Sequence, residues 1–201
     1  MSQLPFSQAC ENNKDPILSV LKDYFKAGSV LEMGHGTGQH AEYFSSKLSV
    51  EWFPADTKEN NPMMSQRIEQ NALPLSAPFT LKVGPQASMK DQLGCSFDHV
   101  FTANTLHIMG QPEVDLFCIQ VKEIINSGGY LLIYGPFKFK GEFTSDSNAD
   151  FDQWLKSQNE ASSIKDFESI QKQLDQNKFE FVARHDLPAN NQIIVFQKYG
   201  I

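Results

Sequence analysis

Hydrophobic residues fall into two patterns that alternate along the chain. Short, nearly continuous apolar runs predict seven β-strands, at Ser29–Met33, Val50–Ala55, Phe79–Val83, Phe97–Ala103, Tyr130–Tyr134, Phe179–His185 and Gln192–Tyr199. Apolar stripes with helical spacing, bounded by Asp, Asn, Pro or Gly, predict helices from Asp15-Pro16 to Gly28, over Gln39–Leu48, from Asn61-Pro62 to Asn71, from Pro112 to Gly128, and over Asp150–Ser157 and Asp166–Gln176.

The order of these elements predicts the fold class. Helices separate the early strands, which requires crossover connections and indicates an α/β fold with a mostly parallel sheet and helices on both faces. The last two strands are joined by too few residues for a crossover helix, so we expect an antiparallel hairpin. The predicted architecture is a Rossmann-like, seven-stranded sheet that ends in this hairpin.

The length of 201 residues fits a single domain that spans residues 1–201. No internal repeat, low-complexity tract or linker divides the sequence. We expect residues 1–14 to form an N-terminal cap segment that folds over the strand ends. Residues 136–149 are polar and contain Lys, Gly, Ser and Asp, so we expect an irregular loop that acts as a lid or a substrate loop.

Charge and cysteine content restrict the partners and the compartment. The 17 basic and 24 acidic side chains give a net charge of −7, which gives no general attraction to nucleic acids or anionic membranes. The cysteines, Cys10, Cys95 and Cys118, form no CxxC pair, and the histidines lack metal-ligand spacing, so we expect neither a disulfide framework nor a metal site. With no signal peptide or membrane span recognisable in the sequence, we expect a cytoplasmic protein.

A glycine-rich turn follows the first predicted strand and opens a helix, with the sequence Glu-Met-Gly-His-Gly-Thr-Gly-Gln-His over residues 32–40. Glycines at such a turn let a ligand approach main-chain N–H groups at the carboxyl ends of the strands. One interpretation is a dinucleotide fingerprint that starts at Gly36 and Gly38 and places Ala41 at its third position. The other is an acidic residue, Glu32, followed by alternate glycines.

Asp56 closes the second predicted strand about 20 residues after the turn, the usual interval for a carboxylate that binds ribose hydroxyls. This residue supports nucleoside binding under either interpretation. The alternate-glycine form, Glu32-x-Gly34-x-Gly36-x-Gly38, resembles the first motif of class I S-adenosylmethionine (SAM)-dependent methyltransferases. The antiparallel terminal hairpin also resembles the sheet of that superfamily, and 201 residues leave little room for the second domain of a dehydrogenase.

Several further motifs resemble one family, the methyltransferase-like family filed as a domain of unknown function. They are Ser7–Leu18, Gly34–His40, Tyr134–Phe137, Ser147-Asn148 and Pro188–Asn191, in this order from about Ser7 to Phe196. The resemblance implies a class I methyltransferase fold and SAM binding, and it raises Lys14 as a contact for a cofactor or substrate carboxylate. The sequence departs from the family where Gly34-His35 and Val83-Gly84 replace the usual residues.

Candidate site residues follow from these motifs. We expect the cofactor to contact Glu32, Gly34, Gly36, Gly38, His40, Asp56 and Lys14. The fourth predicted strand ends in Asn104-Thr105-Leu106-His107 at the edge of the expected pocket. The amide of Asn104 suits a hydrogen bond to a substrate or to the cofactor, and His107 is the candidate general base because an unperturbed imidazole titrates near pH ~6.5.

The leading functional hypothesis is a SAM-dependent methyltransferase that acts on a small molecule or a protein side chain rather than on a nucleic acid. A second hypothesis is a non-catalytic module that binds SAM or S-adenosylhomocysteine (SAH), or a partner, on the same fold. A third is a nicotinamide-dependent oxidoreductase. The sequence predicts neither the methyl acceptor nor the oligomeric state.

Overall fold

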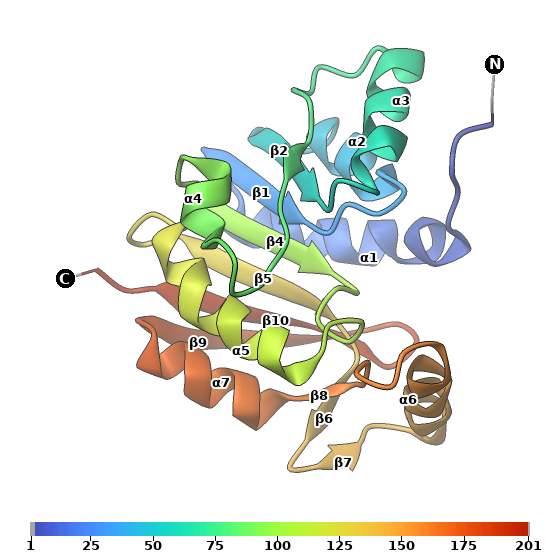
Figure 1. The fold of residues 1–201 in the computed structure, drawn as a ribbon, viewed down its shortest axis with the longest axis vertical. Coiled ribbons are helices and arrows are strands. Elements are labelled where there is room, and N and C mark those ends of the chain that lie inside the picture. The colour runs from blue at the N-terminus through green and yellow to red at the C-terminus, as the bar shows by residue number, and fades with distance from the viewer. Residues whose placement is uncertain (1–2, 201) are drawn as a thin grey trace.

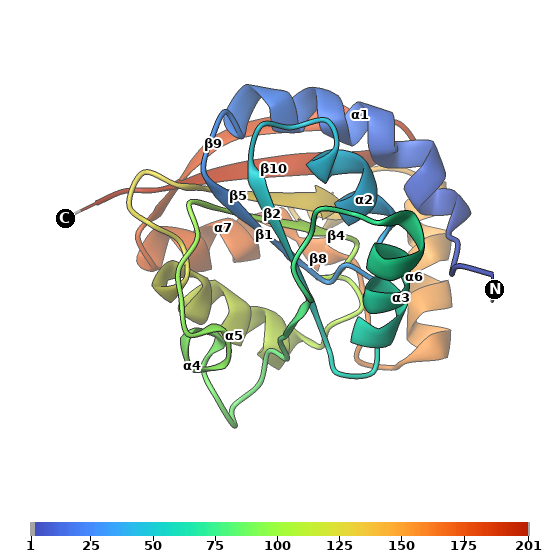
Figure 2. The same ribbon diagram turned by 90° about the horizontal axis from the view of Figure 1, so that it is seen from above.

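The computed structural model describes residues 3–200 and is built around one large sheet, shown in Figures 1 and 2. The sheet has seven strands in the order β3-β2-β1-β4-β5-β10-β9. The strands are β1 (Ser29–Met33), β2 (Glu51–Asp56), β3 (Phe79–Thr80), β4 (His99–Ala103), β5 (Tyr130–Gly135), β9 (Phe179–Leu187) and β10 (Asn191–Lys198). β10 is antiparallel to both of its neighbours and the other pairs are parallel, which confirms the predicted mixed sheet and terminal hairpin.

Helices cover both faces of this sheet, as predicted (Figure 2). One face carries α1 (Gln8–Tyr24), α2 (Gln39–Ser45) and α3 (Asn61–Asn71), and the other carries α4 (Met89–Leu93), α5 (Gln111–Gln120) and α7 (Phe167–Gln176). Successive strand residues point to opposite faces, so Leu131 and Ile133 join one core while Leu132 and Tyr134 join the other. Burial on both faces explains why the strands read as continuous apolar runs.

The expectation of an irregular loop over residues 136–149 is wrong. This segment forms β6 (Phe137–Phe139) and β7 (Glu142–Phe143), which pair with β8 (Lys165–Asp166) in a second sheet, and α6 (Asp146–Gln158) begins within it. Lys140 and Gly141 adopt positive φ angles that make the turn between β6 and β7. The Ser145 hydroxyl caps α6 by accepting a hydrogen bond from the backbone N–H of Asn148.

The start of the first helix is also mispredicted. Asp15-Pro16 does not begin α1. The helix begins at Gln8 with Ser7 as its N-cap, eight residues before the predicted cap at Asp15, and Pro16 lies inside it. The backbone N–H and carbonyl of Ser7 are both bound by the Gln39 side chain, so a residue distant in sequence fixes this helix start. The helix ends at Tyr24, before Gly28.

Several other boundaries differ from the predicted ones. α2 stops at Ser45, β3 has only two residues, and α5 ends at Gln120 and continues as a short 3-10 turn. α4 was not predicted, because five residues are too few to show a helical period. The strand order reverses between β1 and β4, and this switch point is where ligands bind in open α/β sheets.

Candidate functional site

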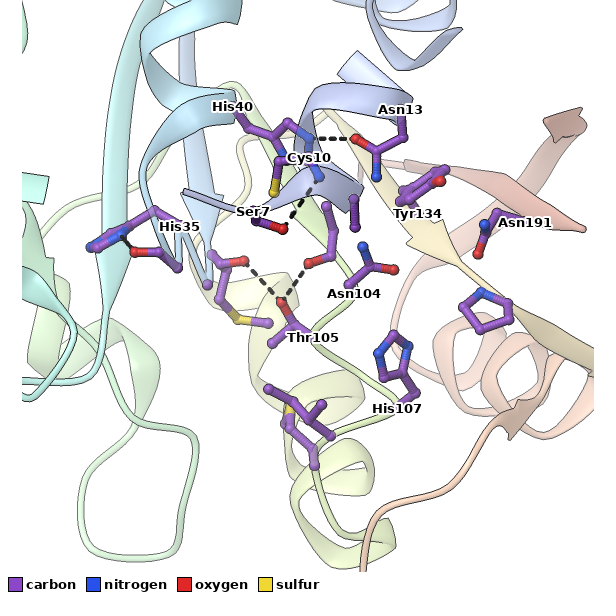
Figure 3. Close-up of a pocket in the computed structure, with 18 of the residues that line it drawn as sticks. Ser7, Cys10, Asn13, His35, His40, Asn104, Thr105, His107, Tyr134 and Asn191 are labelled. Atoms are coloured by element: carbon purple, nitrogen blue, oxygen red, sulfur yellow. Dashed lines mark hydrogen bonds between the residues drawn. The ribbon is translucent and has the colours of Figure 1, made fainter. Parts of the chain in front are cut away.

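A cavity of about 1070 Å³ opens where β1, β2, β4 and β5 end, and Figure 3 shows part of its lining. The walls come from the N-terminal part of α1, the glycine turn after β1, the end of β2, residues 81–83, residues 103–109, α6 and the turn between β9 and β10. Residues 7–16 therefore lie over the strand ends. A volume near ~1,000 Å³ is at the upper end of the range for small-molecule sites.

The three glycines of the turn have different surroundings. All three have positive φ angles, 80° at Gly34, 52° at Gly36 and 76° at Gly38. A Cβ at Gly34 would lie 2.4 Å from Thr105 Oγ1, and one at Gly38 would lie 2.6 Å from Met64 Sδ, so packing requires glycine at both. A Cβ at Gly36 would have no atom within 4 Å and would project into open space beside the cavity.

Asp56 lies directly beneath this turn. Its Oδ2 accepts a hydrogen bond from the Gly36 N–H at 2.9 Å, and its Oδ1 accepts from the Thr57 N–H at 2.7 Å and from the Asn60 amide at 2.9 Å. A carboxylate offers about four acceptor positions, so these bonds leave one position on Oδ2 for a ligand hydroxyl. The predicted ribose contact therefore has room for one such bond without displacing a protein donor.

Glu32 does not line the cavity. The carboxylate is buried at the end of β1 and accepts a hydrogen bond from Trp52 Nε1 at 2.8 Å. Burial raises the pKa of Glu32 to about 7, although the Trp52 bond favours the charged form. The structure thus places Glu32 between β1 and β2, where it joins two strands, and its predicted contact with a cofactor stays a prediction.

His40 and His35 both line the cavity, and the rings of both are held by other parts of the chain. His40 Nε2 hydrogen-bonds Asn13 Oδ1 at 2.7 Å, the contact drawn in Figure 3, and joins α2 to α1. Burial lowers the pKa of His40 to about 4, so this ring is neutral at pH ~7. His35 Nε2 hydrogen-bonds Asn61 Oδ1 at 3.1 Å, which connects the glycine turn to α3.

Lys14 lies on α1 and does not line the cavity. The ammonium pairs with Glu11 and lies 5.0 Å from the centroid of the Tyr43 ring. Gly38 likewise does not line the cavity, because it packs against α3. The residues of α1 that do line it include Cys10 and Asn13, which were not predicted.

Asn104 and His107 meet near the end of β5. A Cβ built on Gly135 would be 3.7 Å from Asn104 Oδ1 and 3.6 Å from His107 Nδ1, so the two polar atoms face the same point. Asn104 has a φ angle of 58°, a left-handed conformation that Asn tolerates better than most residues. Burial, and to a smaller extent the Lys165 ammonium, lowers the pKa of His107 to about 4.

Arg67 is a positioning residue that sequence reasoning missed. This buried side chain donates hydrogen bonds to the Thr37 carbonyl at 2.8 Å, to the Glu42 carboxylate at 2.5 Å and to the Pro5 carbonyl at 2.6 Å. It thereby connects α3 with the glycine turn, α2 and the N-terminal segment. The partners are 25 to 62 positions away in sequence, so no local motif predicts these contacts.

A family model described as a protein of unknown function (DUF938) matches residues 4–198. The chain belongs to the DUF938 family. This confirms the resemblance to a family of unknown function that the sequence motifs suggested, and the match covers every helix and strand described in the fold.

Solved structures of methyltransferases share the fold of this DUF938 protein. An O-methyltransferase family protein from Burkholderia thailandensis has a TM-score of 0.80 at 14% identity, covering 96% of this chain and 58% of its own. Human N-acetylserotonin methyltransferase in complex with SAM has 0.74 at 13% identity, covering 96% and 53%. Magnesium protoporphyrin IX methyltransferase from Synechocystis PCC 6803 with bound SAH has 0.69 at 13% identity, covering 98% and 90%.

These comparisons establish the class I methyltransferase fold for the DUF938 chain. The chain spans little more than half the length of the Burkholderia and human proteins. Over residues 3–200, no group of three or more His, Cys, Asp or Glu side chains is placed to hold a metal ion. Within the same range, every helix is too short or too polar to cross a bilayer.

Proposed function

We propose that this DUF938 protein is a SAM-dependent methyltransferase that acts on a small molecule or a protein side chain. The observation that carries the proposal is the open space at Gly36 directly above Asp56, at the switch point of the sheet. A nucleoside needs this combination, because its sugar must approach the main chain closely and a carboxylate must accept from its hydroxyl.

The donors and acceptors of the cavity fit SAM. Asp56 Oδ2 has one acceptor position left for a ribose hydroxyl, and Gly36 leaves the sugar room to reach it. Leu81 and Val83 supply apolar contacts for a base on the adjacent wall. SAM, when bound, supplies a methyl group on a positively charged sulfur. The two neighbours with SAM or SAH in their structures support this choice of cofactor over a nicotinamide.

Asn104 and His107 are the proposed acceptor-side residues. Bound SAM would supply the methyl group, Asn104 would hold the acceptor atom through its amide, and His107 would accept a hydrogen bond and then the proton from that atom. Burial lowers the pKa of His107 to about 4, so the ring is neutral at pH ~7 and free to accept a hydrogen bond. This weak base orients the acceptor's hydrogen and takes the proton only as the methyl group is transferred.

The same weak basicity of His107 favours a second candidate, a module that binds SAM or SAH without transferring a methyl group. Both candidates require cofactor binding, and only the first requires methylation. Incubation with a methyl-labelled donor and a cell extract separates them, because only the methyltransferase moves label into an extract component. The net charge of −7 supports an acceptor other than a nucleic acid.

Isothermal titration of the purified chain with SAM and SAH tests the proposal, with NADH as the comparison ligand. We expect saturable binding of both sulfur compounds and none of NADH. If SAH gives no binding at high micromolar concentration, or if NADH binds and SAH does not, the proposed function is wrong.

A further inference from the structure

The cavity continues beyond Asn104 into a second half, away from Gly36 and Asp56, beside which we propose that the cofactor binds. Figure 3 shows His35 at one side, Asn104 and Thr105 in the middle, and His107 and Asn191 at the other side. The lining of this second half comes from the loop after β4, from α6 and from the turn between β9 and β10. We call it the acceptor half.

Aromatic rings form one wall of the acceptor half. The rings of Phe151 and Trp154 on α6 stack with centroids 5.7 Å apart and planes at 13°. The His107 ring meets Phe151 edge-on at 5.3 Å and 82°. Both residues line the cavity, and a planar ring stacks on an aromatic face more favourably than an aliphatic group does.

Large apolar side chains at this wall are left open to water. Trp154 is 55% exposed and Ile108 is 56% exposed, and both line the cavity. Phe151 and Met109 add further apolar side chains to the lining. A ligand seated here removes this apolar area from water, which is the main favourable contribution in most small-molecule sites.

Among the described residues that line the acceptor half, none is positively charged. Of the described residues that line it, Glu113 alone is charged, and its Oε2 accepts a hydrogen bond from the Gly110 N–H at 2.8 Å. An anionic ligand would need a cation here, and the carboxylate of Glu113 is engaged at the start of α5 by its bond to the Gly110 N–H. The polar groups present are amides, hydroxyls and an imidazole, such as Asn104, Asn191 and His107.

We propose that the acceptor half binds an uncharged, planar aromatic or heteroaromatic small molecule, which stacks along Phe151 and Trp154 with its methyl-accepting oxygen or nitrogen toward Asn104 and His107. The role of this ligand as a methyl acceptor rests on the proposed methyltransferase function. The binding of a flat, uncharged ring rests on the aromatic wall of Phe151 and Trp154. The proposal narrows the acceptor from a small molecule or a protein side chain to a small aromatic molecule.

A set of matched probes tests the proposal by isothermal titration without any cofactor. Naphthol is flat and uncharged, naphthoate carries a negative charge, naphthylmethylammonium carries a positive charge, and decahydronaphthol is uncharged but not flat. We expect naphthol to bind and the other three to bind at least about tenfold more weakly, the equivalent of ~1.4 kcal/mol.

Variants locate the binding. F151L and W154L keep the wall apolar but remove a ring, and each is expected to weaken naphthol binding about three- to tenfold, the range for aromatic stacking. F143L is the matched control, because Phe143 lies on β7, in the second sheet next to α6, and does not line the cavity. Trp154 is more than half exposed, so W154L keeps the test sound if F151L fails to fold.

The outcomes separate this proposal from the proposed function. Charged or non-planar probes that bind as tightly as naphthol, or F151L and W154L that behave like F143L, overturn it. Binding of SAH without binding of naphthol leaves the proposed function standing and overturns this proposal. Binding of naphthol without binding of SAH overturns both the proposed function and the assignment of this half to a methyl acceptor.

Discussion

Gly36→Ala is the substitution that most clearly separates a ligand-binding glycine from a structural one. Gly36 has a φ angle of 52°, and a Cβ there would have no atom within 4 Å. Gly128 is the matched control, because it has a φ angle of 80°, equally open surroundings and no part in the cavity lining. Both variants place an alanine in the left-handed region, and only one adds a methyl group beside the cavity.

The effect on stability is expected to be similar for the two variants. A left-handed conformation disfavours an L-residue by about 1–2 kcal/mol relative to glycine. A chain of this length loses roughly 2–4 °C in Tm for each kcal/mol, so each variant should unfold about 2–8 °C below the wild type. Thermal unfolding followed by circular dichroism measures this shift. A much larger shift for G36A would contradict the open space at its Cβ.

The effect on ligand binding is expected to differ. If a sugar lies against Gly36, the added methyl group occupies that space, and SAH affinity in G36A should fall at least about tenfold, or ~1.4 kcal/mol. G128A should bind SAH as the wild type does. Isothermal titration of SAH into the three proteins makes the comparison. Equal affinity for G36A and wild type would refute the reasoning that a ligand approaches the chain at Gly36.

Further predictions concern groups around the turn. Asp56→Asn should weaken SAH binding about tenfold or more by titration calorimetry, since hydrogen bonds to a charged group are worth ~1.5–3 kcal/mol. For Glu32, burial raises the pKa from 4.5 to about 7, so the folded state keeps a proton that the unfolded state releases. This contribution is present below pH ~4.5 and is lost as pH rises to ~7, so the unfolding free energy of wild type relative to E32Q should fall by about 3 kcal/mol over this window in urea titrations. Arg67→Lys should destabilise the fold by about 1–3 kcal/mol and speed amide exchange at Thr37, because a lysine cannot replace three directed hydrogen bonds.

Each of these has an outcome that contradicts it. Wild-type affinity in D56N would remove the carboxylate from the ligand contacts. A constant stability difference between wild type and E32Q across pH ~4–8 would mean that Glu32 titrates normally despite its burial. Unchanged exchange at Thr37 in R67K would mean that the turn is held without the guanidinium.

Local sequence signals predicted much of the central sheet. β1 has the predicted bounds, because buried strands give continuous apolar runs. α3 begins one residue before the predicted start, with Asn60 rather than Asn61 as its N-cap. The antiparallel hairpin followed from the short connection between the last two strands. The alternate glycines and Asp56 were recognisable because close backbone approach requires glycine and a sugar requires an acceptor.

The features that were mispredicted depend on contacts between distant residues. Ser7 caps α1 because Gln39 holds its backbone, and no local pattern around Asp15-Pro16 reveals this. The inserted sheet over residues 136–166 forms by pairing β6 with β8 across α6. The aromatic wall of Phe151 and Trp154 reads in the sequence as ordinary helix residues, and only the fold brings it beside His107.

A crystal structure of the chain grown with SAH tests the central claim most directly. The account predicts SAH in the cavity at the carboxyl ends of β1 and β2, with a ribose hydroxyl bonded to Asp56, the sugar against Gly36 and the sulfur turned toward Asn104. SAH bound elsewhere, or crystals grown at saturating SAH with this cavity filled only by water, would contradict it.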